Sequence, residues 1–144
     1  MTIAFKRLCE GAVIPSRAHE GDSGMDLSAA ETYSIARNGG RHTFHTGIAA
    51  EIPPGHELQV RPRSGLASKH GVFAMFGTVD QGYRGEIMVT LVNSGREHYQ
   101  VVKGDRIAQL VLAPVVLADI EELGSDARMS DTDRGADGFG SSGK

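Results

Sequence analysis

The dominant pattern along the chain is an alternation of apolar and polar residues, which is typical of β-strands that bury one face. The alternation is clearest at 48–52, 58–60 and 87–92, and further short apolar stretches lie at 3–8, 33–36, 99–102, 107–112 and 115–120. Clusters of Gly, Pro, Asn and Asp separate these stretches, at 21–24, 38–40, 53–55, 80–85, 93–95 and 103–105. Short strands separated by turns predict an all-β sandwich or barrel.

A helical signal is confined to residues 66–70. Ser64 precedes this segment as a plausible N-cap, and Gly71 follows it as a helix stop. The sequence therefore predicts one short helix of one or two turns within the β fold.

The composition changes at residue 124, which divides the chain into a β domain at 1–123 and an arm at 124–144. Met129 and Phe139 are the only large apolar residues of the arm. Such a segment buries too little surface to offset its ordering entropy, so we expect a mobile arm. A disordered tail is the simplest interpretation, but Arg134, Phe139 and the run Gly140, Ser141, Ser142 favour a lid over a nucleotide.

Composition excludes several classes of function. The 144 residues fit one domain, and the net charge of −3 argues against a nucleic-acid partner held on a basic face. No run approaches the ~18 apolar residues of a membrane span, and the first residues lack the apolar core of a signal peptide. The single cysteine, Cys9, fits a reducing, cytoplasmic compartment. The scattered histidines suggest no zinc site.

Segment 61–67 has the chemistry of a phosphate site. Arg63 supplies a guanidinium, Ser64 a hydroxyl, and Gly65 a backbone that a phosphate can approach closely. A helix cap with solvated arginines is an equally good interpretation of these residues alone.

Three further positions could carry chemistry. Segment 77–86 is typical of a β-hairpin with Asp80 and Tyr83 at its tip, either as ordinary turn residues or as a general base beside an aromatic platform. Asp26 stands at the entry of a strand. Gln109 interrupts an apolar strand, where a buried amide needs partners or a ligand.

Five segments, taken in order, resemble the motifs of the trimeric dUTPase family: GDSGMDLSA (21–29), RPRSGLASKHG (61–71), GTVDQGYRGEI (77–87), GDRIAQLVL (104–112) and DRGADGFGSSG (133–143). The resemblance implies a jelly-roll-like β subunit in a homotrimer whose active sites are shared between subunits. It also implies hydrolysis of dUTP to dUMP and pyrophosphate, which lowers dUTP and supplies dUMP for thymidylate synthesis. Mg²⁺ would be held mainly by the triphosphate.

The resemblance also implies a role for each site residue. Asp80 would be the general base for the attacking water, and Tyr83 would pack under the deoxyribose. Uracil would be read by the hairpin backbone and a nearby side chain: Gly77, Thr78, Val79 and Met88. The phosphates would be held by Arg63, Ser64, Gly65 and Gln109, with Asp26 supporting the water shell of the metal. In the arm, Arg134 would clamp the γ-phosphate, Phe139 would stack on uracil, and Gly140, Ser141 and Ser142 would wrap the phosphates.

Two positions depart from the family pattern. Ala74 stands where many relatives have an asparagine that helps to read uracil, and Asp137 stands where a glycine is usual. Two alternatives to a dUTPase remain: a dCTP deaminase, which shares the trimeric fold, and a non-enzymatic trimer that uses the pocket as a ligand-controlled switch.

Overall fold

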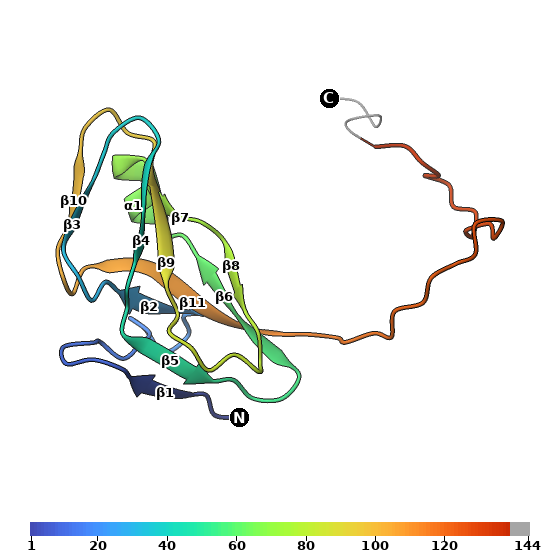
Figure 1. Ribbon diagram of the computed structural model, residues 1–144, viewed down its shortest axis with the longest axis horizontal. Helices are drawn as coiled ribbons and strands as arrows, with labels where there is room; N and C mark the ends of the chain where they lie inside the picture. The colour runs from blue at the N-terminus through green and yellow to red at the C-terminus, as the bar shows by residue number, and fades with distance from the viewer. Residues whose placement is uncertain (139–144) are drawn as a thin grey trace.

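A computed structural model describes residues 1–138 as a β fold with one short helix (Figure 1). Its eleven strands and helix follow in the order β1 (Ala4–Arg7), β2 (Gly24–Ser28), β3 (Tyr33–Ile35), β4 (Gly40–Phe44), β5 (Ile48–Glu51), β6 (His56–Arg61), α1 (Ser64–His70), β7 (Val72–Ala74), β8 (Gly77–Val79), β9 (Val89–Asn93), β10 (Tyr99–Val101) and β11 (Arg106–Pro114). The predicted all-β class is confirmed.

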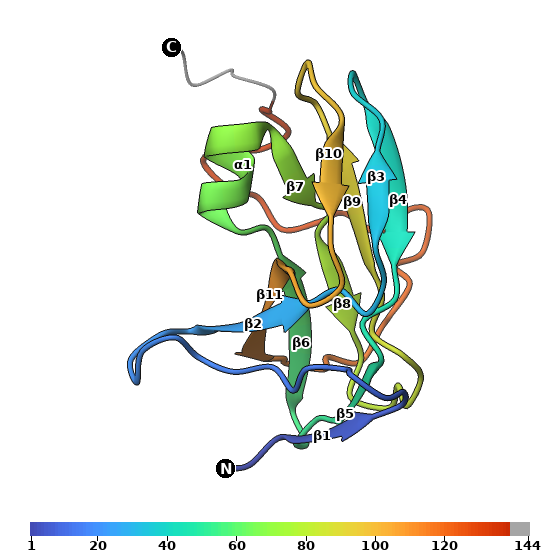
Figure 2. The same ribbon diagram turned by 90° about the vertical axis from the view of Figure 1, so that its left-hand side faces the viewer.

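The strands form a four-stranded sheet (β2-β11-β6-β8), a three-stranded sheet (β4-β9-β7) and two pairs (β1-β5 and β10-β3). All of these pairings are antiparallel. One hydrophobic cluster joins them, with Leu58 and Leu110 from the four-stranded sheet, Phe44 and Leu91 from the three-stranded sheet, and Ile48 from β5. Figure 2 shows α1 beside β7, at the end of the barrel toward which β6 runs. This arrangement is the predicted jelly-roll-like barrel.

The register of the four-stranded sheet sorts its residues between two faces. Leu110 and Val60 are paired and buried, so they belong to the core face. The next position of β11, Gln109, lies opposite both Asp26 on β2 and Arg61 on β6. Because directly opposed residues project on the same side of a sheet, these three polar residues form a row on the outer face.

The helix begins two residues before the predicted segment 66–70. Ser64 is its first residue, and Arg63 is the N-cap, with extended backbone and no side-chain capping bond. The prediction of Ser64 as N-cap is therefore wrong. Gly71 ends the helix as predicted, in the left-handed conformation (φ 65°), and donates its N–H to Ala67 O at 3.0 Å.

The apolar stretch at 115–120 is not a strand. β11 ends at Pro114, Val115 donates its N–H to Gly55 O at 2.8 Å, and the chain then leaves the barrel (Figure 1). Val116, Leu117 and Ile120 are 92%, 85% and 101% exposed. Periodicity cannot distinguish such a segment from a buried strand, because both are short apolar runs. The division of the chain at residue 124 stays a prediction.

The sequence reading also missed two strands. β4 has the sequence GRHTF. Its inward positions are Gly40, His42 and Phe44, of which only Phe44 is a large apolar residue, so the segment shows no alternation of apolar and polar residues. β7 has only three residues. Within residues 1–138, no helix is long and apolar enough to cross a membrane.

We expect Asn93 to be a main determinant of stability. This fully buried side chain donates from Nδ2 to Ile35 O (3.2 Å) and Glu97 O (2.8 Å), and accepts from Gly95 N (2.9 Å). Asn93→Ala removes all three bonds and should lower the free energy of unfolding by about 2–4 kcal/mol. Urea unfolding at fixed protein concentration measures the change.

The matched control is Gln100→Ala, on the exposed position of β10. It should change the free energy of unfolding by no more than about 0.5 kcal/mol. Equal losses in the two variants would show that the Asn93 bonds contribute nothing specific.

Candidate functional site

A cleft of about 780 Å³ opens where β2, β11 and the start of α1 meet. Five predicted site residues line it: Asp26, Arg63, Ser64, Gly65 and Gln109. Other lining side chains include the cations Lys69 and Arg106 and the acids Asp22 and Asp105. The structure thus brings the predicted phosphate-binding residues together.

An acidic side chain between two arginines organises this cleft. Asp26 accepts from Arg63 Nε at its Oδ1 and from Arg106 Nη1 at its Oδ2, both at 2.9 Å. Arg63 also donates from Nη1 to Arg106 O at 3.1 Å. These bonds fix the Arg63 guanidinium while leaving it partly exposed to the cleft, where it can bind a phosphate.

Sequence analysis missed Arg106 as a site residue. A signal existed, because Arg106 directly precedes the apolar run 107–112, at the end of a strand whose Gln109 had already been selected. The position of its partner strand could not be read from the sequence. The pairing of β11 with β2, with a register shift between Arg106 and Ala108, brings Arg106 to Asp26.

Gln109 has the polar partner that its half-buried position requires. Its Nε2 donates to Pro62 O at 2.8 Å, which ties β11 to the residues just before α1. The side chain lies over Gly24, where any Cβ would collide with it. Gly24 is therefore required for this close approach, and the amide side chain helps to hold Arg63 and Ser64 in place.

The first turn of α1 presents unbonded donors to the cleft. Ala67 N donates to Arg63 O at 3.1 Å, whereas the amides before it precede the first helical bond. Ser64 adds a hydroxyl, and Gly65 has open space where a Cβ would be.

Farther along the cleft, burial and then the nearby Asp105 carboxylate raise the pKa of Tyr99. The Tyr99 phenol is therefore neutral at neutral pH.

The segment that carries Asp80 and Tyr83 is a turn, but not the predicted hairpin. β8 pairs with β6, whereas β9 begins at Val89 and pairs with β4 and β7. Residues 80–88 therefore connect two sheets. Tyr83 N donates to Asp80 O at 3.0 Å within this turn. The hairpin prediction was wrong because alternation identifies strands without identifying their partners.

The residues predicted to read uracil lie around this turn. Thr78 and Met88 are exposed, Tyr83 is 44% exposed, and Val79 is buried. Ala74, which replaces the usual asparagine, is buried on β7 at 2% exposure. Its methyl group belongs to the core.

A single chain does not bring Asp80 to the cleft. Val79 pairs with Leu58 near the start of β6, whereas Arg63 and Ser64 follow the end of that strand. At about 3.3 Å per extended residue, the course from Glu57, the residue of β6 before the Leu58–Val79 pair, to Arg63 covers on the order of 20 Å. The predicted base and the predicted phosphate-binding residues therefore lie at opposite ends of β6.

The described part of the arm, residues 124–138, does not close over the cleft either. Arg134 donates from Nε to Asp137 O at 2.9 Å, within the arm itself, and the arm extends away from the barrel (Figure 1). Phe139, Gly140, Ser141 and Ser142 lie outside the described residues.

The side chains of the cleft fit an indirectly held Mg²⁺ better than a directly ligated one. Within residues 1–138, no group of three His, Cys, Asp or Glu side chains could hold a metal ion. Asp26 uses one lone pair on each oxygen for an arginine and keeps others free to accept from water. Mg²⁺ commonly keeps several waters and binds mainly through substrate phosphates, which suits this arrangement.

Comparison with known proteins identifies the family of this chain. The family model described as dUTPase matches residues 10–143. The deoxyuridine 5'-triphosphate nucleotidohydrolase of Beijerinckia indica subsp. indica is 51% identical over 148 residues, covering 98% of this chain and 91% of that protein. The corresponding protein of Crocosphaera subtropica is 48% identical, with 99% of each chain covered.

Solved structures show the same fold. The dUTPase of Staphylococcus bacteriophage 80alpha with dUpNHpp has a TM-score of 0.89 and 28% identity, covering 99% of each chain. A mutant dUTPase from phage phi11 of S. aureus, described with a structural Mg(II) ion, has a TM-score of 0.81 and 25% identity, covering 90% of this chain and 100% of that one. Full-length similarity in sequence and in fold shows that this chain belongs to the dUTPase family of nucleotidohydrolases.

Proposed function

We propose that this protein acts as a homotrimer that hydrolyses dUTP to dUMP and pyrophosphate in active sites shared between subunits. The observation that carries the proposal is the separation of Asp80 from the Arg63 cleft along β6, on the order of 20 Å. One chain holds both halves of a site but keeps them apart. A neighbouring copy that places its Asp80 turn over this cleft would complete the site.

Asp80 would act as the general base. Its carboxylate accepts a proton from a water molecule, whose oxygen forms a bond to the α-phosphorus. The bond between the α-phosphorus and the bridging oxygen breaks, and pyrophosphate leaves with the electron pair. The exposed position of Asp80 on its turn leaves the carboxylate free to meet a water and a substrate.

The cleft would stabilise the charge on the leaving pyrophosphate. Arg63 is fixed by Asp26, and Ser64 and Gly65 offer a hydroxyl and backbone N–H groups. Gln109 supports this group through Pro62 O. When bound, Mg²⁺ would neutralise phosphate charge, with Asp26 accepting from a coordinated water.

Base and sugar selection would come from the turn side. Tyr83 would pack under the deoxyribose and leave no room for a 2′-hydroxyl. The backbone of Gly77, Thr78 and Val79, with Met88 beside it, would read the uracil edge. Cytosine reverses the donor and acceptor pattern and would leave buried groups unpaired, which can cost about 10⁴–10⁵-fold.

The arm would supply the lid from a further subunit. Arg134 would clamp the γ-phosphate, Phe139 would stack on uracil, and Gly140, Ser141 and Ser142 would wrap the phosphates. Residues 116–137, which lead to this end of the arm, are exposed, which supports its reaching a neighbouring copy.

Substrate choice tests the activity directly. Pyrophosphate release from dUTP should exceed release from dCTP, dTTP and UTP by at least about 10³-fold in kcat/KM, because each analogue changes a group that the site reads. Ammonia release from dCTP would instead identify a deaminase. Tight dUTP binding without turnover would identify a ligand-controlled switch.

The role of Asp80 is tested by Asp80→Asn. Removing the base should lower kcat by about 10²–10⁴-fold while the Kd of dUTP changes little. Single-turnover kinetics and calorimetry measure the two quantities. Asp119→Asn, at an exposed position beyond β11, is the matched control and should behave as the wild type. A kcat near wild type for Asp80→Asn would remove Asp80 as the base.

Mixed trimers test whether the sites are shared. A chain with Asp80→Asn and a chain lacking residues 133–144 should each fold and be almost inactive alone. If base and lid come from different subunits, random 1:1 co-assembly should restore about a quarter of wild-type activity per site. Sites built within one chain would gain nothing on mixing, which would refute the shared-site proposal.

A further inference from the structure

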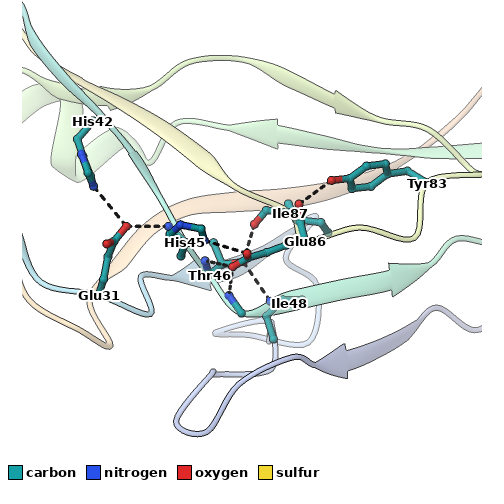
Figure 3. Close-up of polar contacts among 9 residues, drawn as sticks. Glu31, His42, His45, Thr46, Ile48, Tyr83, Glu86 and Ile87 are labelled. Atoms are coloured by element: carbon teal, nitrogen blue, oxygen red, sulfur yellow. Dashed lines mark hydrogen bonds and ion pairs between the residues drawn. The ribbon is translucent and has the colours of Figure 1, made fainter.

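Glu86 lies at the far end of the Asp80 turn, and its side chain points toward His45 and Thr46 (Figure 3). Its Oε1 accepts from Thr46 N at 3.0 Å and from Gly47 N at 2.7 Å. Its Oε2 lies 2.9 Å from His45 Nδ1. One carboxylate thus binds three consecutive residues of another segment.

The two amides need this acceptor. Thr46 and Gly47 connect β4 to β5, and both amides donate to the carboxylate rather than to a strand neighbour. Gly47 has φ 67°, a left-handed conformation that turns its N–H toward Glu86. Without the carboxylate, partly buried donors would lose their partners, which is costly.

A second set of bonds attaches the same end of the turn. Ile87 N donates to Ile48 O at 2.8 Å, and the fully buried Thr46 hydroxyl donates to Ile87 O. The C-terminal end of the turn is therefore joined to the β4–β5 connection by both side chain and backbone.

The bonds continue from Glu86 to the reactive tip. Tyr83 donates its hydroxyl to Glu86 O at 2.9 Å (Figure 3), and Tyr83 N donates to Asp80 O at 3.0 Å. On the other side, Gln81 Oε1 accepts from Gly55 N at 3.0 Å. The turn is thus held by Gln81 near its start and by Glu86 near its end. The Glu86 side chain joins the end that carries Tyr83 to residues 45–47.

The hydrogen bonds between Glu86, His45 and Glu31 shift the pKa values of all three side chains. Burial raises the pKa of Glu86, but His45 and the amides of Gly47 and Thr46 outweigh it, so the pKa lies below its usual value. The bond to Glu86 raises the pKa of His45. Glu31, which accepts from His45 N at 2.9 Å, has a pKa lowered mainly by that bond.

We propose that Glu86 is a positioning residue for the reaction. Its side chain is long enough for Oε1 to accept hydrogen bonds from the amides of both Thr46 and Gly47, and this attachment holds Asp80 and Tyr83 in place. The inference rests on the proposed function, in which Asp80 and Tyr83 meet the substrate. Glu86 itself faces away from the reacting atoms. For this role, the length of the Glu86 side chain matters more than its negative charge.

Two substitutions separate reach from charge. Glu86→Gln keeps the side-chain length and an oxygen that can accept from Thr46 N and Gly47 N. Glu86→Asp keeps the charge but is one methylene shorter. We expect kcat per site to stay within about threefold of wild type for Glu86→Gln and to fall about 10–100-fold for Glu86→Asp, because small misplacements of catalytic groups are costly. KM should change less than kcat, since the cleft proposed to bind the phosphates is untouched and only the sugar and base contacts of the turn shift.

Glu31→Asp is the matched control. It shortens a second carboxylate that contacts His45 but does not bond to residues 80–88, and kcat should stay near wild type. Amide hydrogen exchange gives a readout that does not depend on activity. The amides of Tyr83 and Ile87 should exchange faster in Glu86→Asp than in Glu86→Gln or Glu31→Asp.

The outcomes distinguish the possibilities. The proposal is supported if activity falls from wild type to Glu86→Gln to Glu86→Asp, and if amide exchange is faster in Glu86→Asp. The opposite order would assign Glu86 a charge role and overturn it, as would unchanged exchange in Glu86→Asp. If Glu86→Asp does not fold, a loss beyond about tenfold in Glu86→Gln overturns it, and near-wild-type activity supports it. A wild-type protein inactive on dUTP would refute the proposed function, while exchange would still test the attachment.

Discussion

The pairing of β6 on both of its edges is the constraint on which the rest of the structure depends. β11 and β8 flank this strand, so one of its ends leads into α1 and the phosphate-binding residues while the other lies beside the Asp80 turn. The strand is rigid because both edges are hydrogen-bonded. The separation between Asp80 and Arg63 is therefore fixed by the fold, and for this reason we propose that a second copy completes the site.

Around this strand, carboxylates serve mainly to hold other groups in place. Asp26 fixes Arg63 and Arg106 with its two oxygens, and Glu86 fixes the backbone of Thr46 and Gly47. In both cases an acidic side chain from one segment satisfies donors of another. Asp80 differs from these acids because it is exposed at the tip of its turn, which suits a group that must meet water.

Sequence reasoning succeeded where the chemistry is local and failed where it depends on pairing. The run Arg63, Ser64, Gly65 and the stop at Gly71 are local signals, and the structure has them as expected, apart from the cap at Arg63. The partner of β8 and the contact of Arg106 with Asp26 depend on register between distant strands. The hydrophobic periodicity of one strand does not identify the strand with which it pairs. Glu86 was missed because two of its three partners are backbone amides, which have no signature in the sequence, and the third, His45, is distant along the chain.

The extended course of the chain after Pro114 has a consequence for how the lid operates. Residues 115–138 could span up to about 80 Å when fully stretched, which is far more than the length of any strand in the barrel. In the proposed function, the arm is therefore a tethered ligand of its own assembly, present at a high effective concentration that is set by tether length rather than by affinity. Shortening or stiffening this tether would change how often a lid finds a site while leaving its contacts, once made, the same.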